Sequence, residues 1–141
     1  MKITQNEIIL DRELSELDKF AIRFSDIIKI HTPYVIVSGY VSILLGRSRV
    51  SEDIDMIVPT MGEDKWELIY NDLIKNGYYC LNEEGVHNSY ICLKDKIAVR
   101  FAPKGIVIPN MEVTFPDSIG KIALDTSTQV KIGKNILNGS N

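Results

Sequence analysis

Two aspartates, Asp53 and Asp55, open an otherwise apolar run of residues, DIDMIV at positions 53–58. Aspartate is depleted in strands, so two of them at the start of a strand-like run need a specific reason. Because side chains alternate between the two faces of a strand, both carboxylates should lie on one face and the apolar side chains on the other. The sequence therefore predicts a strand that buries one face and presents two carboxylates on the opposite face.

Two carboxylates at this spacing suit a magnesium ion. Residues one strand repeat apart are separated by roughly 6.5–7 Å along the backbone. At that distance they can jointly hold one or two Mg²⁺ ions, which prefer oxygen ligands and substrate phosphates. A bound cation would also relieve the repulsion between the two charges. The alternative is a pair of exposed carboxylates at the edge of a strand, with no metal.

A strand, a glycine and a helix are expected just upstream of the aspartates. Tyr34 to Ser38 reads as a short buried strand, and Tyr40 to Leu45 as a short helix that follows Gly39. Glycine allows close approach of a ligand to the backbone, and a helix N-terminus attracts anions. Ser38 and Gly39 are therefore candidates for binding a triphosphate. Alternatively, they form a turn that needs glycine only for its backbone angles.

A polar loop, GRSRVSE at residues 46–52, joins this helix to the aspartates. Arg47 and Arg49 are candidates for contacting phosphates. The alternative is a solvated loop or an ion pair with Glu52. Ser51 is a further candidate for the nucleotide site, or it turns the chain into the aspartate strand by a side chain-to-backbone hydrogen bond. Together with the aspartates, these residues favour metal-assisted nucleotidyl transfer.

The segment from Tyr34 to Pro59 resembles the signature of the nucleotidyltransferase-fold superfamily, to which DNA polymerase beta belongs. That signature is a Gly-Gly or Gly-Ser pair that opens a helix, followed by Asp-x-Asp on the next strand. The segment is most similar to the small branch related to nucleotidyltransferase-like toxins of abortive-infection systems, whose loop often reads G-R-x-R-x-T-x-D-I-D. The resemblance implies transfer of a nucleoside monophosphate from a nucleoside triphosphate to a hydroxyl on a protein, RNA or small molecule. It further implies Mg²⁺ or Mn²⁺ at Asp53 and Asp55, and a partner protein in a toxin–antitoxin or other two-component system.

The third carboxylate of that superfamily has no obvious counterpart here. In active members, an acid on a neighbouring strand helps to deprotonate the attacking hydroxyl. The corresponding strand, expected at Ile97 to Ala102, has no acid, and Arg100 stands about where relatives have aspartate. An arginine there could neutralise Asp53 or Asp55 and displace a cation. Glu112 on the following strand is the one plausible substitute as a catalytic residue.

Three functions therefore stay open. The first is an active nucleotidyltransferase. The second is a catalytically degenerate nucleotide-binding or protein-interaction module on the same fold. The third is an α/β domain in which Asp-x-Asp is incidental. Glu112 close to the aspartates would favour the first function, and an ion pair of Arg100 at the site would weaken it.

The remaining sequence predicts an α+β fold in a single domain, residues 1–141, with a mixed, mostly antiparallel sheet and helices packed on one side. Two further helices are expected, Asp11 to Ile30 and a helix that starts with a capping box at Thr60 to Glu63 and ends at Lys75. Residues Ile119 to Leu124 fit either a helix or a strand. Further strands are expected at Tyr78–Leu81, Ser89–Leu93, Ile97–Ala102, Ile106–Ile108, Met111–Phe115 and Gln129–Ile132. Relatives usually continue into a bundle of helices, which this chain lacks before Asn141, so it is either a minimal version or part of a longer protein.

Composition limits the classes of partner and location. The 141 residues include 19 acidic and 16 basic ones, for a net charge of −3, which argues against a broad nucleic-acid footprint. Apolar runs fall well short of the ~20 residues that span a bilayer, and the first residues lack a signal-peptide core. Two cysteines without metal-type spacing fit a reducing cytoplasm. The sequence thus predicts a cytoplasmic protein with no membrane partner.

Overall fold

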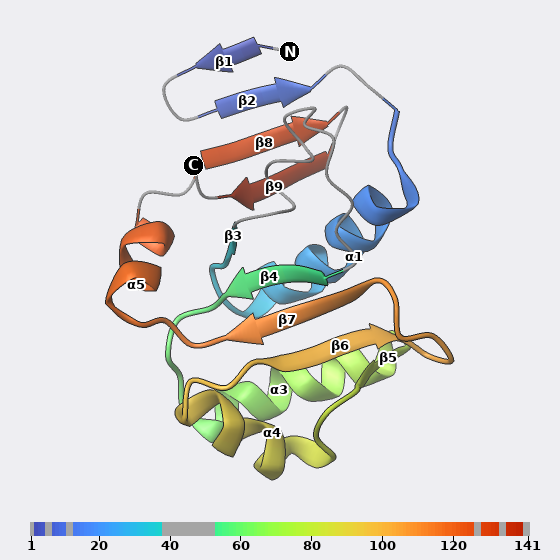
Figure 1. The fold of residues 1–141 in the computed structure, drawn as a ribbon, viewed down its shortest axis with the longest axis vertical. Coiled ribbons are helices and arrows are strands. Elements are labelled where there is room, and N and C mark those ends of the chain that lie inside the picture. Colours follow the sequence, from blue (N-terminus) through green and yellow to red (C-terminus); the bar gives the residue numbers. More distant parts are fainter. Residues whose placement is uncertain are drawn as a thin grey trace.

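The computed structural model describes residues 2–4, 7–10, 13–37, 53–125, 128–132 and 135–139. Within these ranges, nine strands form one sheet in the order β1-β2-β8-β9-β3-β4-β7-β6-β5 (Figure 1). Five neighbouring pairs are antiparallel and three are parallel, which confirms the predicted α+β fold with a mixed, mostly antiparallel sheet. In the described part of the chain, no helix is both long and apolar enough to span a bilayer.

The bounds of the elements are as follows. The strands are β1 (Lys2–Thr4), β2 (Glu7–Leu10), β3 (Val35–Val37), β4 (Asp53–Ile57), β5 (Tyr78–Cys80), β6 (Val99–Pro103), β7 (Asn110–Thr114), β8 (Thr128–Ile132) and β9 (Asn135–Gly139). The helices are α1 (Glu16–His31), α3 (Glu63–Lys75), α4 (Gly85–Lys94) and α5 (Ser118–Asp125).

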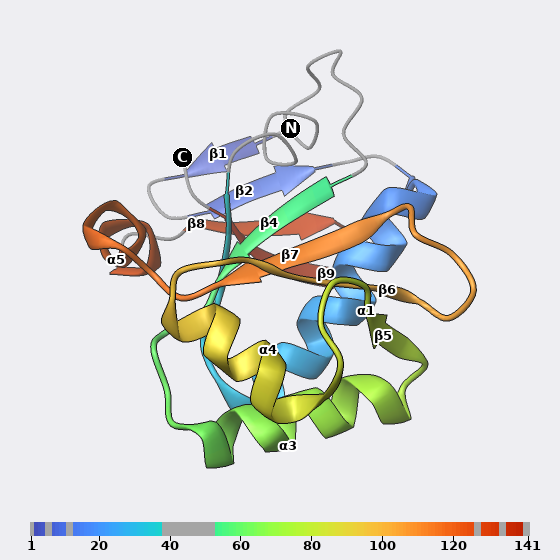
Figure 2. The same ribbon diagram turned by 60° about the horizontal axis from the view of Figure 1, so that its bottom comes forward.

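Helices α1, α3 and α4 cover one face of the sheet, and the core lies between them and the strands (Figure 2). Ile54 and Met56 of β4 are fully buried there, as the alternation of β4 predicts. Phe101 of β6 lies between two helices, with its ring centroid 6.0 Å from that of Phe24 in α1 and 6.1 Å from that of Trp66 in α3. Burial of large aromatic side chains accounts for much of the stabilisation of such a core.

Helix α1 begins at Glu16, five residues later than the sequence predicted. Ser15 caps the helix, because its hydroxyl accepts a hydrogen bond from the Asp18 backbone N–H at 3.1 Å. The Asp18 carboxylate in turn accepts one from the Ser15 backbone N–H at 2.9 Å. This capping box satisfies backbone groups that would otherwise lack partners at the helix start, and so fixes where α1 begins.

The predicted capping box at α3 is wrong, although the helix itself is confirmed. The residue that precedes the first helical turn is Gly62, whose side chain cannot accept a hydrogen bond, and Thr60 lies two residues before it. The helix ends at Lys75 as predicted, and Gly77 has the positive φ of 89° that terminates it.

The predicted strand Ser89–Leu93 is wrong, because these residues belong to helix α4. The Ser89 hydroxyl accepts a hydrogen bond from the Trp66 indole N–H at 2.9 Å, and Leu93, one turn later, is fully buried. Residues four apart share one face of a helix, so both side chains point to α3 and the core. This helix ends at Lys94, and Lys96, just beyond it, has a φ of 62°.

One other predicted strand is wrong, one open assignment is decided, and three strands were not expected. Ile106 to Ile108 form a loop between β6 and β7, with each side chain about half exposed, rather than a strand. Residues Ile119 to Leu124, compatible with either structure, lie in helix α5. The predicted last strand is confirmed as β8, but β9 follows it, and β1 and β2 precede α1.

The hydrogen bond between Trp66 and Ser89 yields a prediction about stability. Ser89→Ala should lower the free energy of unfolding by about 1–3 kcal/mol, because it leaves the fully buried indole N–H without an acceptor. Urea denaturation followed by tryptophan fluorescence measures this change. Lys65→Ala, at an exposed position next to Trp66, is the control. Equal stability of the two variants would contradict the prediction.

Candidate active site

The candidate site lies on the sheet face opposite to the core, where β4 is flanked by β3 and β7. In the parallel pairing of β4 with β7, Asp53 lies opposite Asn110 and Asp55 lies opposite Glu112. In the antiparallel pairing of β7 with β6, Glu112 lies opposite Arg100. Residues directly opposite each other on paired strands project to the same face. The sheet therefore brings these five polar side chains together, although they come from three segments of the chain.

Asn110 fixes the orientation of Asp53. Its amide nitrogen donates hydrogen bonds to the Asp53 carboxylate at 2.6 Å and to the Val107 backbone carbonyl at 3.2 Å. Asn110 is only 5% exposed, and its buried amide oxygen accepts no hydrogen bond among the described groups. An amide donor orients a carboxylate without cancelling its charge. Asp53 is thus held in a fixed orientation at the exposed end of β4.

Glu112 lies opposite Asp55 in the strand register, where a protonated Glu112 carboxyl can donate a hydrogen bond to Asp55. Burial raises the pKa of the Glu112 carboxyl above its usual value, and the hydrogen bond and negative charge of Asp55 raise it further. The more distant charge of Asp53 acts in the same direction. Two carboxyl groups can share a hydrogen bond only when one of them carries a proton. The face therefore gathers more negative charge than its surroundings stabilise, which is the condition that favours a cation or a proton.

Arg100 forms an ion pair with Glu112, and its Nε atom lies 3.0 Å from Oε1 of the glutamate. This attraction lowers the pKa of Glu112, but it ranks below burial and the two effects of Asp55. The arginine side chain is 52% exposed and that of Glu112 is 19% exposed, so water weakens the pair from one side. The sequence predicted that Arg100 could neutralise Asp53 or Asp55, whereas the ion pair found is with Glu112.

The donor set fits magnesium only in part. Across the ranges described, no three His, Cys, Asp or Glu side chains are grouped so that they could hold a metal ion by themselves. Magnesium, however, usually keeps several waters and binds through one or two carboxylates together with substrate phosphates. Asp53 and Asp55 offer oxygen ligands of this kind. The geometry is therefore suited to an ion that arrives with a phosphate ligand rather than to a closed metal site.

The other predicted site residues cannot be compared with the structure. Ser38, Gly39, Arg47, Arg49 and Ser51 lie outside the described residues, as does the helix expected at residues 40–45. Their contacts with a nucleotide stay predictions. Sequence reasoning missed Asn110, whose role depends on the pairing of β7 with β4, a strand 57 residues away in the chain. An asparagine directly before a strand-like run was the only local sign of it.

The sequence matches no known family model, and no curated protein is significantly similar to it. The resemblance to nucleotidyltransferases therefore depends on the residues between Tyr34 and Pro59 and on the carboxylates that the sheet places beside Asp55. Fold alone does not define an activity, so the function has to be argued from this face.

The raised pKa of Glu112 predicts a pH-dependent effect of Glu112→Gln. In the folded state this carboxyl keeps its proton at pH values where the unfolded chain has lost it. Wild-type stability should therefore fall as the pH rises from about 4.5, the usual value, through the raised pKa. The glutamine cannot ionise and can still donate to Asp55. The variant should thus gain stability relative to wild type over this interval and keep the gain at neutral pH.

Urea denaturation of both proteins at a series of pH values, without divalent cations, measures the difference. Glu67→Gln, at an exposed position of α3, is the matched control and should follow wild type. A glutamine variant at position 112 that is less stable than wild type at neutral pH, or a difference that does not change with pH, would contradict this assignment.

Proposed function

We propose that the chain is a magnesium-dependent nucleotidyltransferase that transfers a nucleoside monophosphate from a nucleoside triphosphate to a hydroxyl acceptor. The observation that carries the proposal is the position of Glu112, which lies beside Asp55 on the face that also bears Asp53. Such a face supplies the two metal-binding carboxylates and the third acid that the resemblance implies. The acceptor is a protein, an RNA or a small molecule.

Each residue of the face has a distinct role in this proposal. Asp53 and Asp55 bind Mg²⁺ or Mn²⁺, and Asn110 keeps Asp53 oriented. The metal, when bound, stabilises charge on the attacking and leaving oxygens. Glu112 accepts the proton of the attacking hydroxyl, and its raised pKa makes it a stronger base than an ordinary glutamate. The acceptor oxygen then bonds to the α-phosphorus as pyrophosphate leaves.

The triphosphate contacts are proposed for the segment between β3 and β4. Ser38 and Gly39 would approach the phosphates through the backbone, and Arg47 and Arg49 would complement their charge. Ser51 would lie close to the same group. A cytoplasmic location and a partner protein, as in toxin–antitoxin pairs, belong to the same proposal.

The ion pair between Arg100 and Glu112 favours a second candidate function. An arginine that keeps the proton acceptor occupied would suppress catalysis, since loss of a general base costs about 10²–10⁴-fold in rate. The chain would then be a catalytically degenerate nucleotide-binding or protein-interaction module on the same fold.

The double variant Asp53→Asn, Asp55→Asn tests the metal site. It should abolish Mg²⁺-dependent binding of nucleoside triphosphates, because amides replace both charged ligands. The fold should stay intact or become slightly more stable, since two like charges are removed. Calorimetric titration of the protein with nucleoside triphosphates, with and without Mg²⁺, measures the binding.

Asp64→Asn with Asp95→Asn is the matched control, because it removes two exposed aspartates elsewhere on the surface. It should bind like wild type. Unchanged nucleotide affinity in the Asp53, Asp55 variant would overturn the metal site.

The variant Arg100→Gln tests whether the arginine acts on Glu112 or on the phosphates of the nucleotide. Because the ion pair with Glu112 brings the positive charge of Arg100 to the carboxylate face, its removal should tighten Mn²⁺ binding in the presence of a nucleoside triphosphate, by roughly tenfold or less for a half-exposed pair. The gain should disappear when Glu112→Gln is also present. Weaker metal binding in Arg100→Gln would instead assign the arginine to the phosphates.

A further inference from the structure

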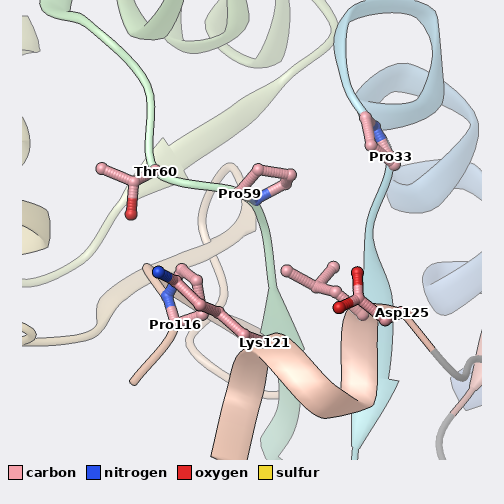
Figure 3. Close-up of a pocket in the computed structure, with 7 residues that line it drawn as sticks. Pro33, Pro59, Thr60, Pro116, Lys121 and Asp125 are labelled. Atoms are coloured by element: carbon pink, nitrogen blue, oxygen red, sulfur yellow. The ribbon is translucent and has the colours of Figure 1, made fainter. Parts of the chain in front are cut away.

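A cavity lies at the carboxyl ends of β4 and β7, beyond the carboxylates of the candidate active site (Figure 3). Its volume is about 450 Å³, within the usual range for small-molecule sites. It is lined by Pro33, Pro59, Thr60, Pro116, Lys121, Leu124 and Asp125. Pro59 follows Asp53 by six residues and Asp55 by four along an extended chain, so the pocket lies about 20 Å from the first aspartate and about 13 Å from the second.

The topology explains why a crevice forms at this place. Strands β4 and β7 are parallel neighbours, and the chain leaves their carboxyl ends in different directions. After β4 it continues into α3, which covers the core face. After β7 it continues into α5, where the Cβ position of Gly120 lies 3.2 Å from Cδ1 of Ile57, on the opposite face from Ile54 and Met56. Crevices where consecutive connections diverge to opposite faces are common binding sites in α/β sheets.

The walls of the pocket are stiff. Proline rings fix the backbone φ angle at Pro33, Pro59 and Pro116, which lie two residues before β3 and two residues after the ends of β4 and β7. The start of α5 is held by Asp117, whose Oδ1 accepts a hydrogen bond from the Gly120 backbone N–H at 2.7 Å. A site that is ordered before binding loses less conformational entropy when a ligand enters.

Two opposite charges of α5 line this apolar pocket. Lys121 and Asp125 lie four residues apart, and among the described residues neither forms an ion pair. A lysine that precedes an aspartate by four residues is the less favourable order for pairing along a helix. In Figure 3 the Lys121 amino group extends toward Thr60 and Pro116, whereas the Asp125 carboxylate lies at the other side of the pocket.

We propose that this pocket binds a small zwitterion with an apolar body, of the α-amino acid class. Lys121, with the Thr60 hydroxyl beside it, binds the carboxylate of the ligand, and Asp125 binds its ammonium group. The apolar body packs against Leu124 and the proline rings. The Cβ atoms of residues four apart on a helix are ~5–6 Å apart, and the flexible stem of the lysine lets its amino group move toward the Asp125 side of the pocket when a compact ligand binds.

L-Phenylalanine is the probe for a test by NMR. Titration into ¹⁵N-labelled wild-type protein should shift the backbone amides of Thr60 and α5 in a saturable manner, with a dissociation constant on the order of 1 mM. Two analogues that each lack one charge, 2-phenylethylamine and 3-phenylpropanoate, should bind roughly tenfold more weakly. Equal affinity for the three compounds would overturn the recognition of a zwitterion.

Variants that each remove one charge of the pocket test which group of the ligand that charge binds. Lys121→Met should lose the preference for L-phenylalanine over 2-phenylethylamine, and Asp125→Asn should lose the preference over 3-phenylpropanoate. Both residues are exposed, and the amide spectrum shows directly whether each variant is folded. Lys65→Met is the control and should bind like wild type. No saturable shift in wild type, or unchanged preferences in both variants, would overturn the proposal, whatever the outcome at Asp53 and Asp55.

Discussion

The parallel pairing of β4 with β7 is the constraint on which the rest of the molecule depends. It joins a strand from the helix-rich first half to a strand from the second half, and its register places Glu112 opposite Asp55 and Asn110 opposite Asp53. A slip of one residue would turn Glu112 to the core face and leave the aspartates without a third acid. At the carboxyl ends of the same two strands, the diverging connections create the proline-lined pocket.

The negative charge on the outer face of the sheet, the face that bears Asp53, Asp55 and Glu112, can be balanced in two ways. Asp53, Asp55 and Glu112 lie together, and burial of Glu112, together with the charges of Asp55 and Asp53, raises the pKa of its carboxyl and so the cost of ionising all three. Without a cation, the Arg100 guanidinium reduces this cost, and so does protonation of Glu112 at low pH. A divalent cation with its phosphate ligand would do so more completely, because it brings two positive charges to the aspartates. The same arrangement thus accounts for both candidate functions, which differ in whether Arg100 can be displaced.

The sequence correctly predicted those features that depend on residues close to one another in the chain. The alternation in β4 correctly placed its apolar residues Ile54 and Met56 in the core, and the helix predicted to end at Lys75 is confirmed as α3. Segment Ser89–Leu93 was mistaken for a strand because Tyr, Ile and Cys suit one, whereas its state depends on a contact of Ser89 with Trp66, 23 residues away. The position of Glu112 beside Asp55 likewise follows from the pairing of strands that are distant in the chain. The local sequence around Glu112 does not show this pairing.

Paramagnetic broadening by Mn²⁺ is the most direct measurement of the central claim, that the outer face of β4 and β7 binds a metal together with a nucleotide. Substoichiometric Mn²⁺ would be added to ¹⁵N-labelled protein with a non-hydrolysable nucleoside triphosphate, and again without it. The account predicts that amide signals of Asp53, Asp55 and Glu112 broaden selectively, and more strongly with the nucleotide. Broadening centred elsewhere, or none at these residues, would contradict it.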